Sequence, residues 1–178
     1  MPLIGEQQFL VFYDENVAKI YRYIYFRVGS KEQAQDLTSE VFLKSWQYLN
    51  GDPQSAGSKE LQNPRAFFYQ VARNLIIDFY RQKDKASLSL EEIADKQIAD
   101  KIADKTDGPL ERIAKALDLE AIKQSLWSLN EDYRDVIIWR YLDELEIKEI
   151  AEILGKNEGA VRVLLSRALA GLKEVLER

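Results

Sequence analysis

The sequence contains no cysteine and no histidine, and each absence removes a class of chemistry. Without cysteine there can be no disulfide, no thiolate metal site and no cysteine nucleophile. Without histidine the commonest general base and the commonest metal ligand are missing. An enzyme would have to work with carboxylates, lysine or tyrosine alone, and no nucleophile–base pair or metal constellation is visible. We therefore expect a protein that is not an enzyme and that needs no metal and no cofactor.

Strong charge of one sign, long apolar runs and targeting signals are also lacking. The formal net charge is −5, and the stretches 1–86, 87–109 and 110–178 carry +1, −3 and −3. Because no stretch is strongly cationic, the chain is not expected to bind duplex DNA tightly on its own by counterion release. No basic-then-apolar signal opens the chain, and no apolar run approaches the length of a membrane span. These features predict a cytoplasmic protein without membrane insertion.

The N-terminal part of the chain has the pattern of amphipathic helices. A hydrophobic content of 46% argues against disorder. Apolar residues recur at helical spacing over 6–28, and Gly29 follows the last of them. Ser30 and Gln33 fit a capping box that opens a second helix, which should end near Leu49.

The second helix has a polar side. Its inward side should hold Leu37, Val41, Phe42 and Trp46. On the other side, polar residues at steps of three or four share one face. The residues of this face are Asp36, Glu40, Lys44 and Gln47. For a lone helix, the simpler interpretation of such a face is ordinary solvated surface.

A third helix combines basic and aromatic residues. Asn63 followed by Pro64 predicts an N-cap and a first helical position. The outward side should carry Tyr69, Gln70, Arg73, Asn74 and Arg81, with Arg65, Lys83, Lys85, Phe67 and Tyr80 adding charge and rings. Such a mixture suits single-stranded nucleic acid, because bases stack on rings while cations follow phosphates. The alternative is that the aromatic residues are simply core.

An acidic segment divides the chain. Ile-Ala-Asp-Lys occurs three times between 93 and 105, and Asp107-Gly108-Pro109 follows. We interpret 87–109 as a linker between two helical domains, at 1–86 and 110–178. No strand pattern appears, so the predicted fold class is all-α. The C-terminal domain should contain four helices, of which the last two form a helix-turn-helix.

The helix-turn-helix prediction depends on the stretch from Leu145 to Leu172. Ile147, Ile150, Ala151 and Leu154 recur at helical spacing, and Gly155 stands where a left-handed C-cap is usual. Asn157 can then cap a second helix. Its buried stripe should be Val161, Leu164, Leu165, Ala168 and Leu172. The second helix of such a motif normally enters the DNA major groove, although any helical hairpin would give the same pattern.

Three blocks in this order resemble a bacterial RNA polymerase sigma factor of the extracytoplasmic-function (ECF) class. The segment 36–46, Asp-Leu-Thr-Ser-Glu-Val-Phe-Leu-Lys-Ser-Trp, resembles the family segment that docks on the polymerase clamp. The segment 63–78, beginning Asn-Pro-Arg-Ala-Phe-Phe-Tyr, resembles the helix that melts promoter DNA and reads the minus-ten element. The segment 129–141 and the helix-turn-helix resemble the domain that reads the minus-thirty-five element.

The resemblance implies core RNA polymerase and promoter DNA as partners, and in this class an anti-sigma factor is a common third partner. It places polymerase binding on Asp36, Leu37, Glu40, Lys44 and Gln47. It places minus-ten DNA binding on Arg65, Phe67, Tyr69, Gln70, Arg73, Asn74 and Arg81, with Asn74 where the family captures a flipped base. It places minus-thirty-five DNA binding on Lys156, Asn157, Glu158, Arg162, Ser166 and Arg167. The acidic linker resembles the family connector that passes through the polymerase's RNA path.

The last helix departs from the family pattern. Where the family usually has Thr-Val-Lys-Ser-Arg, this chain has Ala160-Val161-Arg162-Val163-Leu164, and Glu146 stands where a serine N-cap is usual. Fewer donors remain for base edges and phosphates. Two alternatives therefore stay open: a stand-alone helix-turn-helix regulator, and a polymerase- or protein-interaction module that has lost DNA binding.

Overall fold

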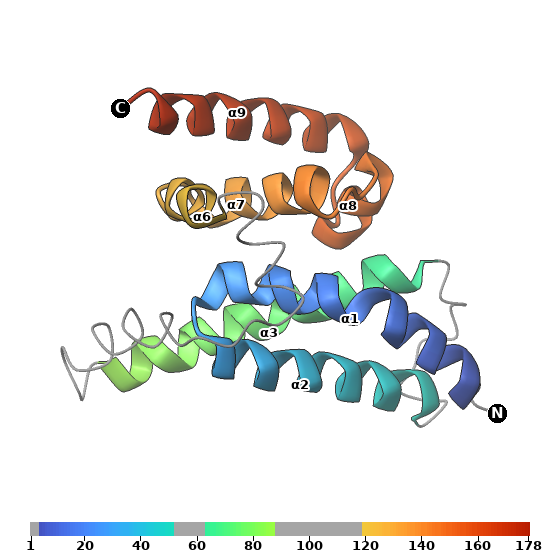
Figure 1. The fold of residues 1–178 in the computed structure, drawn as a ribbon. Helices are drawn as coiled ribbons and strands as arrows, with labels where there is room; N and C mark the ends of the chain where they lie inside the picture. The colour runs from blue at the N-terminus through green and yellow to red at the C-terminus, as the bar shows by residue number, and fades with distance from the viewer. Residues whose placement is uncertain (1–3, 52–62, 88–118) are drawn as a thin grey trace. The chain divides into compact units, whose positions relative to one another are not determined.

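The computed structural model describes residues 4–51, 63–87 and 119–178, and all secondary structure in these ranges is helical (Figure 1). The all-α prediction is therefore confirmed. The structure divides into two compact units, Met1–Lys105 and Thr106–Arg178. Apart from Ser87, the predicted linker lies outside the described residues. Its limits stay a prediction.

Unit 1 is a bundle of three helices, α1 (Glu6–Val28), α2 (Lys31–Asn50) and α3 (Pro64–Ser87), which pack against one another in all three pairs (Figure 1). One aromatic residue from each helix meets in the core. The ring of Phe42 lies 6.5 Å from that of Phe9 and 5.0 Å from that of Phe68, measured between centroids. Each ring comes from the apolar stripe of its own helix, so the stripes determine how the bundle closes.

A two-residue turn reverses the chain between α1 and α2. Gly29 adopts φ 74°, the left-handed conformation that glycine enters without a steric penalty. The Ser30 hydroxyl then accepts a hydrogen bond from the Gln33 N–H at 3.4 Å. The predicted capping box is only half formed, because the Gln33 side-chain oxygen has no hydrogen-bond partner. The serine cap alone begins α2.

Unit 2 contains α6 (Leu119–Trp127), α7 (Glu131–Ile137), a π-helical turn at Ile138–Leu142, α8 (Ile147–Leu154) and α9 (Glu158–Leu176). A buried arginine joins the first two helices. Arg134 donates to the backbone carbonyls of Leu126, Trp127 and Leu129, at 3.0, 3.3 and 3.1 Å. Two of these carbonyls belong to the last turn of α6 and the third to the turn that follows, where carbonyls have no full set of intrahelical donors.

The helix-turn-helix forms as predicted. Gly155 ends α8 at φ 63°, and the Asn157 side chain accepts from the Ala160 N–H at 2.7 Å to begin α9. At the start of α8 the Glu149 carboxylate accepts from the Glu146 N–H at 2.8 Å. A glutamate in the first turn therefore supplies a cap although the usual serine is missing.

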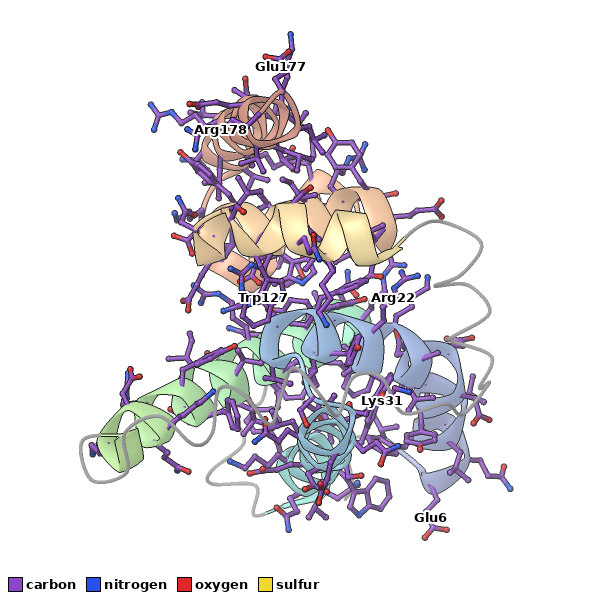
Figure 2. The ribbon with its side chains drawn as sticks, turned by 60° about the vertical axis from the view of Figure 1, so that its left-hand side comes forward. Glu6, Arg22, Lys31, Trp127, Glu177 and Arg178 are labelled. Atoms are coloured by element: carbon purple, nitrogen blue, oxygen red, sulfur yellow. The ribbon has the colours of Figure 1, made fainter. Side chains whose placement is uncertain are left out.

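Some apolar residues are less buried than their spacing predicts. On α9, Val161, Leu165 and Ala168 are buried as predicted, but Leu164 and Leu172 are only half-buried. Trp46 on α2 is half-buried as well. Around the end of α9 the charged side chains are exposed, as Figure 2 shows for Glu177 and Arg178. Lys173 pairs with Glu177, and Arg178 pairs with Glu174.

Candidate protein and nucleic-acid interfaces

The polar face of α2 lies on the surface of unit 1. Asp36, Lys44 and Gln47 are exposed, and Glu40 pairs with Lys44 at 3.4 Å across one helical turn. Leu37, the remaining predicted polymerase-binding residue, is buried in the core at 8% exposure. Four of the five predicted residues therefore share an accessible face. Leu37 lies on the buried side of the same helix.

A leucine in the middle of this face was not predicted. Leu43 is 56% exposed and follows Asp36 by seven residues and precedes Gln47 by four. These are helical repeats, so the three side chains lie on one stripe. In protein-binding surfaces a few apolar anchors carry much of the affinity, so an exposed leucine among polar side chains is compatible with such a surface. The heptad spacing in the sequence could have revealed it.

The predicted DNA-binding residues of α3 are not all accessible. Gln70, Asn74 and Arg81 are exposed, whereas Arg65, Phe67 and Arg73 are half-buried. The expectation that Tyr69 lies on the outward side is wrong. Tyr69 is fully buried, and its ring packs against Tyr23 at 5.7 Å between centroids.

The burial of Tyr69 follows from helical geometry. Ala72 and Ile76 lie three and seven residues further along α3, and both are also fully buried. Residues at these steps share one face, so Tyr69 belongs to the stripe that packs on α1. Its neighbour Gln70 lies about 100° further round the helix and faces out.

A groove lies between α2 and α3 in front of Asn74. Its volume is about 270 Å³. The rings of Tyr48 and Phe67 approach within 5.1 Å between centroids at a tilt of 33° and form part of its wall. The full lining is Lys44, Tyr48, Phe67, Val71, Asn74, Leu75 and Asp78. An amide that both donates and accepts, next to aromatic rings, suits an unstacked nucleic-acid base.

Two residues from α2 enter this groove, and only one of them was singled out from the sequence. Tyr48 is 44% exposed and comes from α2, whereas the DNA prediction was based on α3, which begins at Pro64. Lys44 was assigned to the polymerase face and also lines the groove. No sequence signal connects Lys44 and Tyr48 with Asn74, because these residues meet only through packing.

Arg65 lies outside this groove. It lines a second hollow, of about 450 Å³, together with Lys19 and Glu15.

The predicted DNA-binding residues of the helix-turn-helix are all exposed, in the turn or on α9. Three have contacts within the protein. The side-chain oxygen of Asn157 caps α9, and Arg162 pairs with Glu158 at 3.2 Å. Val163 is 51% exposed on the same helix, while Leu164 is half-buried. The exposed surface of the turn and of the start of α9 therefore combines a few charged groups with the apolar side chain of Val163.

The described residues contain neither a metal-binding cluster nor a membrane-spanning helix. Among these residues, no three or more acidic side chains are grouped so that they could hold a metal ion. No helix in the same ranges is long and apolar enough to cross a membrane.

Comparison with known proteins assigns the two units. The model of Sigma-70 region 2 matches residues 12–86, and that of Sigma-70, region 4 matches residues 119–172. The chain is 31% identical over 163 residues to the ECF RNA polymerase sigma factor SigW of Bacillus subtilis, covering 89% of this chain and 83% of that protein. The chain belongs to the ECF sigma factor family. Such proteins act in transcription initiation and are not enzymes in general.

Other relatives agree with this assignment. The sigma factor is 30% identical over 162 residues to the RNA polymerase sigma factor YlaC of Bacillus subtilis, covering 91% of this chain and 88% of that protein. It is 31% identical over 165 residues to the ECF sigma factor BldN of Streptomyces coelicolor. That match covers 92% of this chain but only 58% of BldN, so the chain spans little more than half of that relative.

Two solved structures share the fold of this sigma factor. CnrH, in complex with the cytosolic domain of CnrY, matches 97% of this chain and 90% of its own at a TM-score of 0.67 and 18% identity. RpoE of Bartonella quintana, in complex with the anti-sigma factor NepR, matches 95% and 96% at a TM-score of 0.64 and 21% identity. At these identities the likeness concerns the fold.

Proposed function

We propose that this protein is a non-catalytic, cytoplasmic sigma factor that binds core RNA polymerase and directs promoter recognition, DNA melting and transcription initiation. The groove beside Asn74 carries the proposal, because it combines an amide with the rings of Tyr48 and Phe67. In this proposal, 1–86 binds polymerase and minus-ten DNA, 87–109 is an acidic linker and 110–178 binds minus-thirty-five DNA.

The polymerase would bind the outer face of α2. Asp36, Glu40, Lys44 and Gln47 supply the polar rim of this face, and Leu43 supplies an apolar centre. Protein interfaces commonly combine a polar rim with an apolar centre that is desolvated on binding. Leu37 contributes from the core by holding the helix in position.

The non-template strand of the minus-ten element would follow α3. One unstacked base would enter the groove and meet the Asn74 amide, while Phe67 and Tyr48 offer ring surface. Flipping a base out of a duplex costs a few kcal/mol, so a groove that exists before binding favours the open state. Phosphates would be held by exposed or half-buried polar groups of the same helix: Arg65, Gln70, Arg73 and Arg81. Tyr69 is left out of this surface because it is buried.

Upstream duplex DNA would be held by the start of α9. Arg162 and Arg167 supply charge, Ser166 supplies a hydroxyl, and Lys156 stands in the preceding turn. Asn157 and Glu158 would act mainly by capping the helix and by orienting Arg162. An anti-sigma factor is a further proposed partner, because the structure of RpoE with NepR shows this fold bound to one.

Run-off transcription tests the proposal. Core RNA polymerase would be supplied with the full chain and a library of promoter fragments, and transcripts compared with those of the core enzyme alone. Protein-dependent transcripts from a defined subset of fragments are expected. Core binding without any transcript would indicate an interaction module, and DNA binding without core binding would indicate a stand-alone regulator.

Asn74→Ala tests the base-binding groove within the same assay. Because the Asn74 side chain is exposed, we expect normal folding and unchanged core binding. Open-complex formation on duplex promoters should fall about tenfold or more, since a bidentate base contact is worth about 1–3 kcal/mol. The control is Gln82→Ala, an exposed residue of α3 outside the groove. Full transcription by the Asn74 variant would contradict the assignment.

A further inference from the structure

The outward side of α9 has an uncharged crest. Four residues at steps of four, three and four lie along it, so they share one face. All four are exposed, and Val163 is the largest, at 51% exposure. The opposite side of the helix carries the buried Val161, Leu165 and Ala168. We define the crest as Gly159, Val163, Ser166 and Ala170.

Packing within the protein does not explain the smallest residue of the crest. A side chain at Gly159 would meet only the Asn157 side-chain oxygen, at 3.4 Å, which is an ordinary contact. Glycine destabilises a helix relative to alanine, so its presence here has no advantage for the isolated fold. A surface that approaches the helix closely would favour it, because glycine allows the closest approach of a backbone.

Arginines lie on both sides of the crest. Arg162 and Arg167 are exposed and are spaced so that they flank Val163 on opposite edges of the outward face. Arg162 is held by its ion pair with Glu158 at 3.2 Å. Two cationic edges around a narrow uncharged ridge match a groove whose walls carry phosphates and whose floor does not.

A small apolar side chain at the middle of such a ridge has one partner in the major groove. The floor of that groove consists of hydrogen-bonding groups and the C5 methyl of thymine, which is its apolar feature. We propose that Val163 is a specificity-determining residue that reads this methyl group in the upstream promoter element. The inference rests on the proposed binding of α9 to duplex DNA and adds the base that it selects.

Replacing thymine by deoxyuridine tests the inference, since the two bases differ only in the methyl group. Full-length protein with core RNA polymerase would select duplexes from a library with a randomised upstream element. Each thymine of the selected sequence would then be replaced in turn. At one or two positions, uracil should weaken holoenzyme binding about fourfold, the effect of losing one buried methyl group.

Two variants test whether Val163 causes the difference in binding between thymine and uracil duplexes. With Val163→Ala, thymine and uracil duplexes should bind equally at those positions. Leu169→Ala is the matched control, because Leu169 is 39% exposed on α9 but lies off the crest, and it should keep the full difference. Thermal melts of both variants would show that the fold is intact.

Three results would overturn the inference: a selected upstream sequence without thymine, equal binding of thymine and uracil duplexes by the wild type, or a full thymine preference in Val163→Ala. If protein-dependent transcripts persist in these cases, only the reading of the methyl group fails. If no upstream sequence is selected and no transcript appears, the proposed function fails with it.

Discussion

At the scale of single residues, two residues that lie close together on α3 differ completely in burial. Tyr69 is fully buried against Tyr23, whereas Asn74, five residues later on the same helix, lies exposed at the groove. Both are polar enough for a DNA-binding role to be plausible from sequence. Burial separates them, because a ring without solvent-accessible surface cannot stack on a base unless the core opens.

Arg134 in unit 2 is a second residue whose burial differs from what its residue type suggests. An arginine in the sequence suggests surface, yet Arg134 is 7% exposed and donates to three backbone carbonyls. Its guanidinium also lies 5.0 Å from the ring centroid of Trp127. A buried cation is tolerated where its donors are satisfied, so this arginine serves the fold of unit 2 and is not available to phosphates.

Glu144 provides a prediction about stability. It adopts φ 57°, left-handed backbone that is strained for a side chain with a Cβ, in the turn before α8. Glu144→Gly should therefore raise the free energy of unfolding by about 0.5–1 kcal/mol, because the relief of strain exceeds the extra entropy of glycine in the unfolded chain. Thermal or urea unfolding measures the change.

The same substitution within a helix is the control. Glu152→Gly removes an exposed glutamate from α8, where the backbone is helical, and should lower the free energy of unfolding by about 1 kcal/mol. Opposite signs for the two variants are expected. A loss of stability in both would mean that the Glu144 side chain makes favourable contacts that exceed the strain.

At the scale of elements, α2 has three different sides. One side joins the core through Val41 and Phe42, an adjacent side lines the groove through Lys44 and Tyr48, and the outer side carries Leu43. In unit 1, a single helix therefore borders both proposed interfaces. Displacing α2 would affect the base-binding groove as well as polymerase binding.

Leu43→Asp provides a prediction about this element. The side chain is 56% exposed, so stability should change little, but a charge would replace the apolar centre of the proposed polymerase face. Affinity for core RNA polymerase should fall at least tenfold, as is usual for a central apolar anchor. Binding of fluorescently labelled protein to the core enzyme measures this.

Val11→Asp is the matched variant for that experiment. Val11 is also an exposed apolar residue of unit 1, at 52%, but it lies on α1 outside the proposed face. It should bind core polymerase as the wild type does. If both variants bind equally well, Leu43 is not part of the interface.

At the scale of the whole molecule, charge argues for action with a partner. The net charge is −5 and the isoelectric point is about 5.0, which is unfavourable for holding a polyanion alone. Two units with a modest proposed DNA-binding surface each would gain affinity when a common partner holds both in place. A sigma factor on core polymerase is in this situation.

This balance predicts different behaviour for the free chain and the holoenzyme. At about physiological salt, the free protein should not retain a promoter duplex at micromolar concentration, because it releases few counterions. The holoenzyme should retain the same duplex at nanomolar concentration. Fluorescence anisotropy of labelled promoter DNA measures both. Tight binding by the free chain would instead favour a stand-alone regulator.

Local sequence patterns were enough to predict α1, α2, α3, the helix-turn-helix and the caps at Gly29, Gly155 and Asn157, and they also indicated the family. These features depend on local spacing and on backbone preferences that each short segment expresses alone. The folded structure was needed to show that Tyr69 is core, that Tyr48 lies in the groove and that the glutamine half of the capping box does not form. Such outcomes depend on which side of a helix its neighbours cover, and residues distant in the sequence set that by packing together.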